Sequence, residues 1–333
     1  MKIKWDQGKW QEMIGTVAVI FCLICGCQDN QKSAPQPESS SISMKSEKVK
    51  QEESPKFEQH LKASEQGNAD SKNKAIEAIK AFGGRLARDD TGNVIQVDFS
   101  RTNISDAGLV HLKELTSLTT LTLDDSKITN AGLAHLRGLT NLYISGSDIT
   151  NAGLVHLKAL TKLTTLNLDD TNITDAGLVH LKGLTTLHIS GSNITDAGLE
   201  HIKGLTNLTT LKLKDTNISD AGLVHLKELT NLTILELSRS YISDAGLVHL
   251  KALTNLTTLK LSLCEITDAG LVHLKGLTNL TTLHLGYTKV SDTGLVHLKE
   301  LTRLTFLYMS GTKVTKEGVM KLEAAIPDCR IEH

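Results

Sequence analysis

The 333-residue chain is poor in aromatic residues, cysteine and proline, and it carries no excess of charge of either sign. Phe, Trp and Tyr make up 3% of the residues, so a folded core must be built from aliphatic side chains. The 36 Lys and Arg residues are balanced by 37 Asp and Glu residues, which argues against DNA or RNA as a partner. No Gly-rich phosphate loop and no Ser/His/Asp arrangement stands out, so we expect neither an enzyme nor a bound cofactor.

The first 27 residues carry an export signal. Three lysines among the first nine residues precede an apolar run over residues 13–24, which is the pattern of a secretory signal peptide. At about 12 residues the run is shorter than the ~20 residues that a membrane-spanning helix needs. It ends in Ile24-Cys25-Gly26-Cys27, which resembles the bacterial lipobox. That resemblance implies lipidation of Cys27 and a membrane-anchored lipoprotein in the periplasm or on the cell surface; an ordinary cleaved signal is the alternative.

Residues 28–72 are rich in Ser, Gln, Glu and Lys and hold three of the four prolines. Such a composition buries too little apolar surface to order itself. We therefore predict a disordered tether between the anchor and the folded part. Beyond the signal only Cys264 and Cys329 remain, more than two repeats apart, so we expect no disulfide.

One glycine recurs at a fixed interval through the rest of the chain. The interval is 24 residues, shortened to 21 in two places. A period of this length indicates a repeat architecture, in which each unit buries its core against its neighbours. The recurring glycines are Gly108, Gly132, Gly153, Gly177, Gly198, Gly222, Gly246, Gly270, Gly294 and Gly318.

A typical unit runs from Leu118 to Leu136 and resembles the LxxLxLxxNxL pattern of the leucine-rich repeat family, in its cysteine-containing and F-box-like form. Period-two alternation predicts a strand around Leu121, and Thr129 is suited to capping a following helix, with an acidic or amide residue in its first turn. Gly132 would permit close approach of backbones. The resemblance implies an α/β solenoid of horseshoe shape, with a parallel concave β-sheet and helices on the convex side.

Ten such repeats occupy residues 94–322, and a cap is predicted at each end. In the N-terminal cap, residues 73–93, Lys74–Phe82 reads as an amphipathic helix that Gly83-Gly84 would stop. Arg85–Arg88 could then pair with the first repeat strand, Ile95–Phe99. The C-terminal cap, residues 323–333, departs from the repeat and should add a final strand.

Variation between the units concentrates on the predicted strands, at side chains that alternation directs away from the core. Solenoids bind partners on their concave sheets, and aromatic side chains beside charges suit binding hot spots. We therefore predict a protein partner on this face; the alternative is that these positions vary without binding. The predicted contact residues are Tyr143, His188, Lys212, Glu236, Lys260, His284, Tyr287, Phe306 and Tyr308.

A column of nine histidines, one per unit from His111 to His297, invites a metal hypothesis. Two imidazoles that share a zinc ion need nitrogens within ~4 Å, whereas neighbouring helices pack with axes about 8–10 Å apart. We therefore expect no metal, and protonation of this column near pH ~6.5 is a milder hypothesis.

Together these patterns predict a monomeric, non-enzymatic interaction scaffold, or receptor-like binding module, displayed at a bacterial cell envelope. A substrate-recruiting adaptor of the F-box type is one alternative, although no F-box helices precede the repeats. A glycan or cell-wall binder is another, with Tyr143 and Tyr308 as its support.

Overall fold

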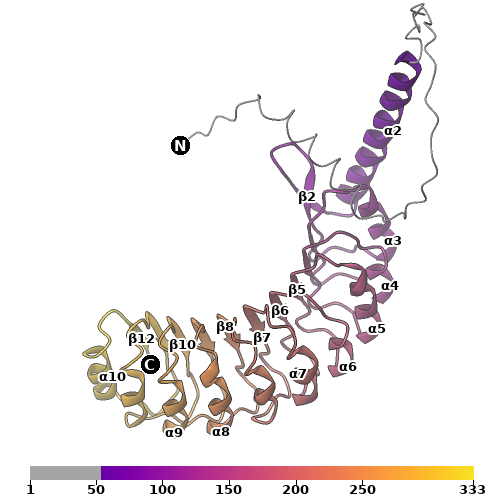
Figure 1. Ribbon diagram of the computed structural model, residues 1–333. Coiled ribbons are helices and arrows are strands. Elements are labelled where there is room, and N and C mark those ends of the chain that lie inside the picture. The colour runs from indigo at the N-terminus through magenta and orange to yellow at the C-terminus, as the bar shows by residue number, and fades with distance from the viewer. Residues whose placement is uncertain (1–53) are drawn as a thin grey trace, which may run out of the picture. The chain divides into compact units, whose positions relative to one another are not determined.

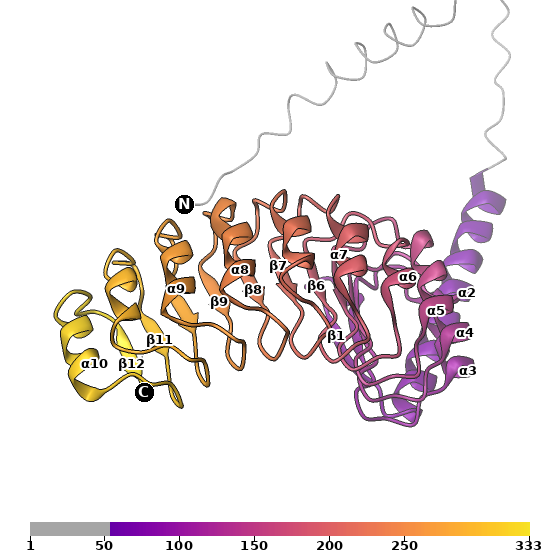
Figure 2. The same cartoon turned by 90° about the horizontal axis from the view of Figure 1, so that it is seen from below.

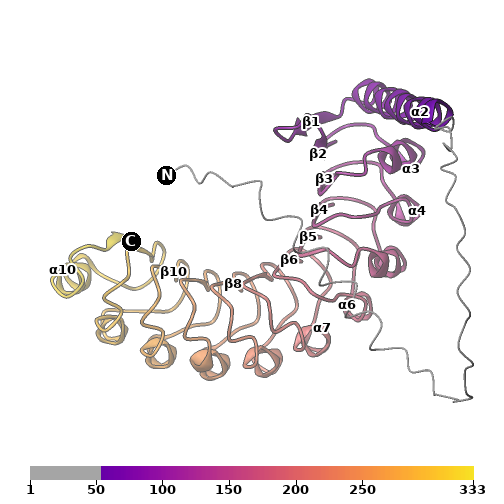
Figure 3. The same ribbon diagram turned by 45° about the horizontal axis from the view of Figure 1, so that its top comes forward.

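Short strands, one from each repeat, form the inner layer of an arc (Figures 1 and 3). The computed structural model describes residues 54–333, and side chains from residue 66 onward. The predicted signal peptide, Cys27 and the first part of the tether therefore lie outside the described residues. All twelve strands join one sheet in chain order. They are β1 Arg85–Arg88, β2 Val94–Asp98, β3 Thr120–Thr122, β4 Asn141–Tyr143, β5 Thr165–Asn167, β6 Thr186–His188, β7 Thr210–Lys212, β8 Ile234–Glu236, β9 Thr258–Lys260, β10 Thr282–His284, β11 Phe306–Tyr308 and β12 Arg330–Glu332.

Neighbouring repeat strands pair in parallel, with equivalent residues side by side. Leu187 pairs with Leu211, and Leu283 pairs with Leu307. In each strand from β3 to β11 the central leucine is buried, and the residues on either side of it are half-buried. The predicted parallel sheet with outward polar side chains is confirmed.

Helical turns line the outer side of the arc, and its two arms meet near α6 and α7 (Figure 3). Four of the ten units have a single α-turn that continues as a 3₁₀ turn, namely α3–η2, α5–η3, α8–η5 and α9–η6, and the others have one α-helix or one 3₁₀ turn. The turns are short because each unit must return to the next strand within 24 residues. No helix within residues 54–333 is both long and apolar enough to cross a membrane. The α-helices are α2 Ser54–Ala81, α3 Asp106–Leu109, α4 Asn130–Leu133, α5 Asn151–Leu154, α6 Asp175–Leu178, α7 Asp196–Ile202, α8 Asp244–Leu247, α9 Asp268–Leu271 and α10 Lys316–Glu323. The 3₁₀ turns are η2 Val110–Glu114, η3 Val155–Ala159, η4 Gly222–Leu226, η5 Val248–Ala252, η6 Val272–Leu274 and η7 Gly294–Leu298.

One aliphatic core runs the length of the solenoid. In the unit described above, Leu121 and Ile128 are fully buried, and Leu133 and Leu136 are at most 2% exposed. A hydroxyl usually occupies the position where the family pattern has Asn, and Ser147 Oγ donates to the Ile144 carbonyl at 2.6 Å. A short side chain that bonds its own turn therefore does the work of the amide at this position.

A carboxylate or amide at the start of each helix ties one repeat to the next. Asp244 accepts hydrogen bonds from the Thr267 amide at 2.8 Å and from its hydroxyl at 2.5 Å. The Thr267 hydroxyl also accepts from Ala269 N, which confirms the predicted cap. The other Asp pairs that repeat this bonding are Asp106–Thr129, Asp175–Thr195, Asp196–Ser219, Asp220–Ser243, Asp268–Ser291 and Asp292–Thr315. In Asn130–Thr150 and Asn151–Thr174 the Asn Oδ1 accepts from the threonine N–H, and the Asn Nδ2 donates to the threonine hydroxyl. We call this row the carboxylate ladder.

The recurring glycine makes room for the carboxylate ladder. A Cβ atom on Gly270 would lie 2.2 Å from Asp244 Oδ1, closer than any van der Waals contact permits. The predicted close approach at this glycine is therefore real, and what approaches is the side chain of the preceding repeat.

The N-terminal helix α2 begins at Ser54, ahead of Lys74, where the amphipathic pattern of the sequence starts. The intervening sequence is rich in Lys, Glu, Gln and Ala, which favour helix even where no core is buried. The end of α2 docks on the solenoid through the buried side chains of Ala75, Ile76 and Ile79. Phe82 was expected on that apolar face, but it lies past the end of the helix and is 41% exposed.

Short strands complete the sheet at both ends. β1 pairs antiparallel with β2, and Gly83 adopts a φ of +84° just after α2 ends. At the other end β12 pairs in parallel with β11. Cys264 and Cys329 are both free and buried.

Candidate protein-binding surface

The side chains predicted to contact a partner are spread along the concave sheet. Eight of the nine occupy half-buried positions on strands β4 to β11, and Tyr287 lies just past the end of β10, where it is exposed. Tyr143 on β4 is seven strands from Tyr308 on β11, which corresponds to roughly 34 Å at the ~4.8 Å spacing of strands. The structure therefore brings His284, Tyr287, Phe306 and Tyr308 together near the C-terminal end, and it leaves Tyr143 apart. The other four residues lie between them, on strands β6 to β9.

Three rings cluster at that C-terminal end. The His284 ring centroid lies 5.6 Å from that of Phe306 and 5.7 Å from that of Tyr308. The Arg330 guanidinium lies 5.9 Å from the centre of the Phe306 ring. These distances fit aromatic pairs and a cation–π contact. We call His284, Phe306 and Tyr308, together with the neighbouring Tyr287, the aromatic end of the sheet.

Two glycines seat the tyrosines of the aromatic end. A Cβ atom on Gly286 would lie 2.2 Å from Tyr308 Cε1, and one on Gly311 would lie 2.6 Å from Tyr287 Cδ1. Both rings therefore rest on the backbone of an adjacent repeat. A ring held in this way loses little conformational entropy when a partner covers it.

Tyr287 also adopts a backbone conformation that is unfavourable for a large side chain. Its φ is 56°, and Leu263, at the same position in the preceding unit, has a φ of 61°. Other units mostly place Gly or Asp here, which tolerate the left-handed region better. Tyr287 is 59% exposed and Leu263 is 50% exposed, so neither gains much burial in return. Strained, exposed apolar residues of this kind mark candidate functional positions.

Sequence reasoning missed two residues of this edge, Leu263 and Tyr241, the latter 69% exposed. A signal for both was present in the sequence. Tyr241 interrupts a column that is otherwise Asn, Asp, Glu or Lys, and Leu263 shares with Tyr287 a column that is otherwise Asp, Gly or Arg. Both residues lie past the ends of the strands, outside the alternating strand positions on which the prediction of contact residues was based.

Charged side chains occupy the middle of the concave sheet. Lys260 Nζ lies 3.4 Å from Glu236 Oε2. Burial, and then the positive charge of Lys212, lower the pKa of His188 to about 4. Burial and the charge of Lys260 also lower the pKa of His284. Both imidazoles are therefore neutral at pH 7, and His284 acts as an aromatic ring rather than as a cation.

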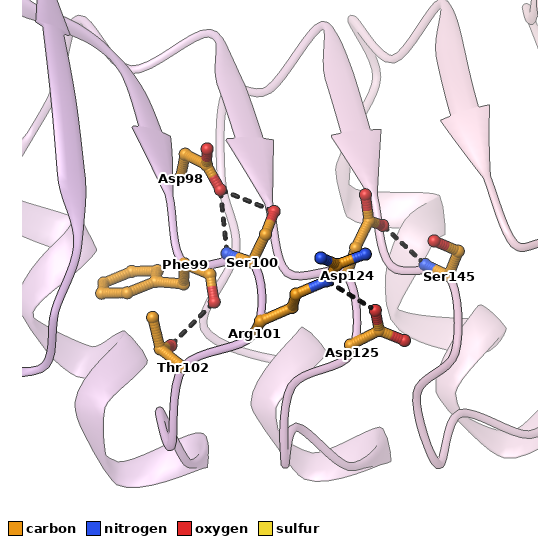
Figure 4. A network of polar contacts seen from close by, with 8 residues as sticks. All are labelled: Asp98, Phe99, Ser100, Arg101, Thr102, Asp124, Asp125 and Ser145. Atoms are coloured by element: carbon orange, nitrogen blue, oxygen red, sulfur yellow. Dashed lines mark hydrogen bonds and ion pairs between the residues drawn. The ribbon is translucent and has the colours of Figure 1, made fainter.

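Carboxylates at the N-terminal end of the sheet accept hydrogen bonds from their own repeat or from the next one (Figure 4). Asp98 accepts from the amide and hydroxyl of Ser100, and Asp124 accepts from the amide of Ser145. Burial raises the pKa of Asp98, but the Ser100 bonds and Arg85 outweigh it, so the pKa lies below its usual value. Asp98 therefore stays ionised and internally bonded, and this end of the face offers a partner fewer free groups than the aromatic end.

The histidine column lies on the helical side of the units, with most of its members half-buried. Within residues 54–333 no group of three or more His, Cys, Asp or Glu side chains is placed to hold a metal ion. The Nδ1 atoms of His273 and His297 are buried and have no hydrogen-bond partner in the described part of the chain.

The geometry defines a leucine-rich repeat solenoid with an open parallel sheet. A family model described as a leucine-rich repeat region matches residues 98–324, more than half of the chain, and the chain belongs to that family. Members of this family are typically non-enzymatic binding scaffolds.

Solved structures include many similar solenoids. Internalin C2 of Listeria monocytogenes is 26% identical, with 72% of this chain and 91% of that chain covered and a TM-score of 0.48. A TDR receptor is 20% identical, with 72% of this chain and 42% of the receptor chain covered and a TM-score of 0.51. The Arabidopsis receptor kinase HAESA, solved in complex with a peptide hormone and a co-receptor, is 18% identical, with 69% and 40% covered and a TM-score of 0.51. A comparison with curated proteins finds no match. At these identities the two receptors establish the fold alone, and the chain spans less than half of their length.

Proposed function

We propose that this protein is a non-enzymatic interaction module that binds a protein partner on its concave sheet, with the aromatic end as the main contact. The observation that carries the proposal is the pre-packed cluster in which the rings of Phe306 and Tyr308 lie 5.6 and 5.7 Å from that of His284, on a face that is otherwise polar. Rigid aromatic side chains that are already ordered before binding are the usual anchors of protein interfaces.

The surroundings of the aromatic end support a protein partner rather than a small molecule. Tyr287 and Leu263 extend the apolar surface past the strand ends, and Lys260, Glu236 and Arg330 provide charges around it. An apolar centre with a polar rim is the common composition of protein interfaces. Among the family's solved members, HAESA was crystallised with a protein co-receptor.

A site-specific cross-linking experiment tests this proposal. A photoreactive amino acid at Tyr308 should give a discrete protein adduct in the native host, because the ring faces the partner. The same amino acid at Val272, a 41% exposed residue of the outer helical side, is the matched control and should give none. A third variant carries the photoreactive amino acid at Phe306 together with Lys260→Ala and Tyr287→Ala. The yield of its protein adduct should fall by at least about tenfold, since losing a hot-spot residue costs ~2 kcal/mol or more of binding free energy. Adducts of equal yield at Tyr308 and Val272, or an adduct that persists in the third variant, contradict the proposal.

We also propose that the protein is exported and anchored to a bacterial membrane through a lipid on Cys27, which would display the solenoid at the cell envelope. Support comes from the lysines before the apolar run at residues 13–24 and from its lipobox-like end. Radioactive palmitate should label the protein, and Cys27→Ser should abolish the label. Cys264→Ser is the control and should leave it unchanged. Labelling that survives Cys27→Ser contradicts the anchor.

A further inference from the structure

Two of the connections from helix to strand are three residues shorter than the rest. The full-length connection over residues 158–165 carries two leucines, Leu160 and Leu163, that fill the space between units. The short connection over residues 182–186 carries one, Leu184. The connection from α4 to β4 is shortened in the same way. A missing leucine leaves its neighbours without packing partners on one side.

An apolar hollow of about 340 Å³ opens beside the short connection between α6 and β6. Its lining includes Leu157, Leu160, Leu163 and Leu181, which are 4–6% exposed. The equivalent leucines of the later full-length unit, Leu250, Leu253 and Leu256, are 0% exposed. The hollow thus leaves accessible apolar surface that the later full-length units, such as the one with Leu250, Leu253 and Leu256, bury completely. Figure 3 shows α6 and β6 at the point where the arms of the arc meet.

Two ammonium groups, Lys158 and Lys182, line the same hollow. Neither forms an ion pair with a carboxylate among residues 54–333. His180 completes this side of the lining, and burial and the charge of Lys158 lower its pKa. An apolar floor beneath two unpaired positive charges is complementary to a molecule with an aliphatic chain and an anionic head.

The other hollow, beside the connection from α4 to β4, lacks these properties. It measures about 250 Å³, below the ~300–1,000 Å³ of small-molecule sites. Its Arg137 donates to the carbonyls of Ala134 and Leu136, and its Lys113 lies 3.9 Å from Glu114. Its cations are already engaged, so the two hollows differ in both size and free charge.

We propose that the hollow between α6 and β6 binds a single-chain fatty acid, with the alkyl chain against Leu160 and Leu163 and the carboxylate between Lys158 and Lys182. The volume lies at the lower end of the range for small-molecule sites and therefore fits one aliphatic chain rather than a two-chain phospholipid. This site is independent of the concave sheet, because it lies in the segments that return the chain from helix to strand.

Calorimetric titration of the full chain with dodecanoate below its micellar concentration tests the proposal. We expect saturable binding at one site, weakened at least about tenfold in Lys158→Glu/Lys182→Glu, since losing a charged hydrogen bond costs on the order of a factor of ten or more. Lys227→Glu/Lys251→Glu is the matched control, because these lysines occupy the same position in units without a hollow and change the net charge equally. The control should bind dodecanoate within about twofold of the wild type.

Two further ligands separate the possible sources of binding. Dodecyltrimethylammonium, which has the same chain and a cationic head, should bind at least about tenfold more weakly than dodecanoate. Vesicles of phosphatidylglycerol should not compete for the site. The proposal is overturned by an absence of dodecanoate binding, by equal losses in the two double variants, by equal affinity for the cationic amphiphile, or by binding to vesicles alone.

Discussion

Replacing Asp244 by Ala removes one step of the carboxylate ladder and should destabilise the fold. Asp244 accepts two hydrogen bonds from Thr267, at 2.8 and 2.5 Å. A hydrogen bond to a charged group contributes about 1.5–3 kcal/mol, and Asp244 is partly open to solvent, so we expect the pair to be worth about 2–3 kcal/mol in total. The free energy of unfolding of Asp244→Ala, from urea denaturation followed by circular dichroism, should fall by that amount.

The matching glycine provides a double-mutant cycle. A Cβ on Gly270 would lie 2.2 Å from Asp244 Oδ1, so Gly270→Ala alone should cost about 1–3 kcal/mol through overpacking. Without the carboxylate the nearest remaining atom is Leu247 Cδ1 at 3.1 Å, the end of a flexible side chain. Because Ala also favours helix by up to about 1 kcal/mol, Gly270→Ala should be close to neutral in the Asp244→Ala background. The two substitutions should therefore be coupled by about 2 kcal/mol.

A second glycine serves as the control for this cycle. Gly276→Ala should be neutral or slightly stabilising, because no atom lies within 4 Å of the added Cβ. The reasoning fails if Asp244→Ala leaves the urea midpoint unchanged, or if Gly270→Ala costs the same with and without the carboxylate. Equal denaturant slopes across the four proteins are required for the comparison.

Three further predictions concern charge and backbone strain. The pKa of His188 is about 4 in the folded protein and ~6.5 in the unfolded chain. The contribution of the neutral imidazole to the free energy of unfolding is therefore fully present above about pH 6.5, and it declines by about 1–2 kcal/mol toward pH 4 once solvent screening is allowed for. His188→Gln should make the free energy of unfolding depend less on pH, as measured by urea titrations at several pH values. Burial raises the pKa of Asp268, but hydrogen bonds from Ser291 and Thr293 outweigh it and lower it overall. Its contribution is thus present above pH ~3.9 and lost below, and acid unfolding of Asp268→Asn should depend less on pH in that range; an unchanged profile contradicts this. Leu263→Asn should raise the free energy of unfolding by about 0.5–1 kcal/mol, because Asn tolerates the left-handed φ of 61°, and a decrease would show that the leucine is held by packing.

The repeat period and the alternation within each strand were enough to predict the fold. Leu121 and Leu123 point inward as expected, and strands β2 to β12 pair in parallel in chain order, because a fixed period leaves one way to stack identical units. The N-terminal boundary was not predictable in the same way. Helix α2 begins at Ser54, about 20 residues before the amphipathic pattern starts at Lys74, so its first part has no apolar periodicity from which a helix could be predicted.

The candidate binding surface was predictable only in part. Alternation identified the outward strand column, but the clustering of His284, Phe306 and Tyr308 depends on distances between repeats. Leu263 escaped attention because its importance rests on a backbone angle that no hydrophobicity pattern encodes. The role of Asp244 was likewise seen only as a helix-dipole effect, since its partner Thr267 belongs to the next unit.

The identical register of every repeat strand has a consequence for how such a molecule can change in length. Removing or duplicating one whole 24-residue unit would regenerate the same strand pairing, the same carboxylate-to-hydroxyl bond and the same glycine contact at the new junction. The separation between Tyr143 and Tyr308 can therefore vary only in steps of one strand, about 4.8 Å each, while every interface stays intact. Duplication of a unit can thus increase the distance between two binding residues in fixed steps, without any change in the repeats that carry them.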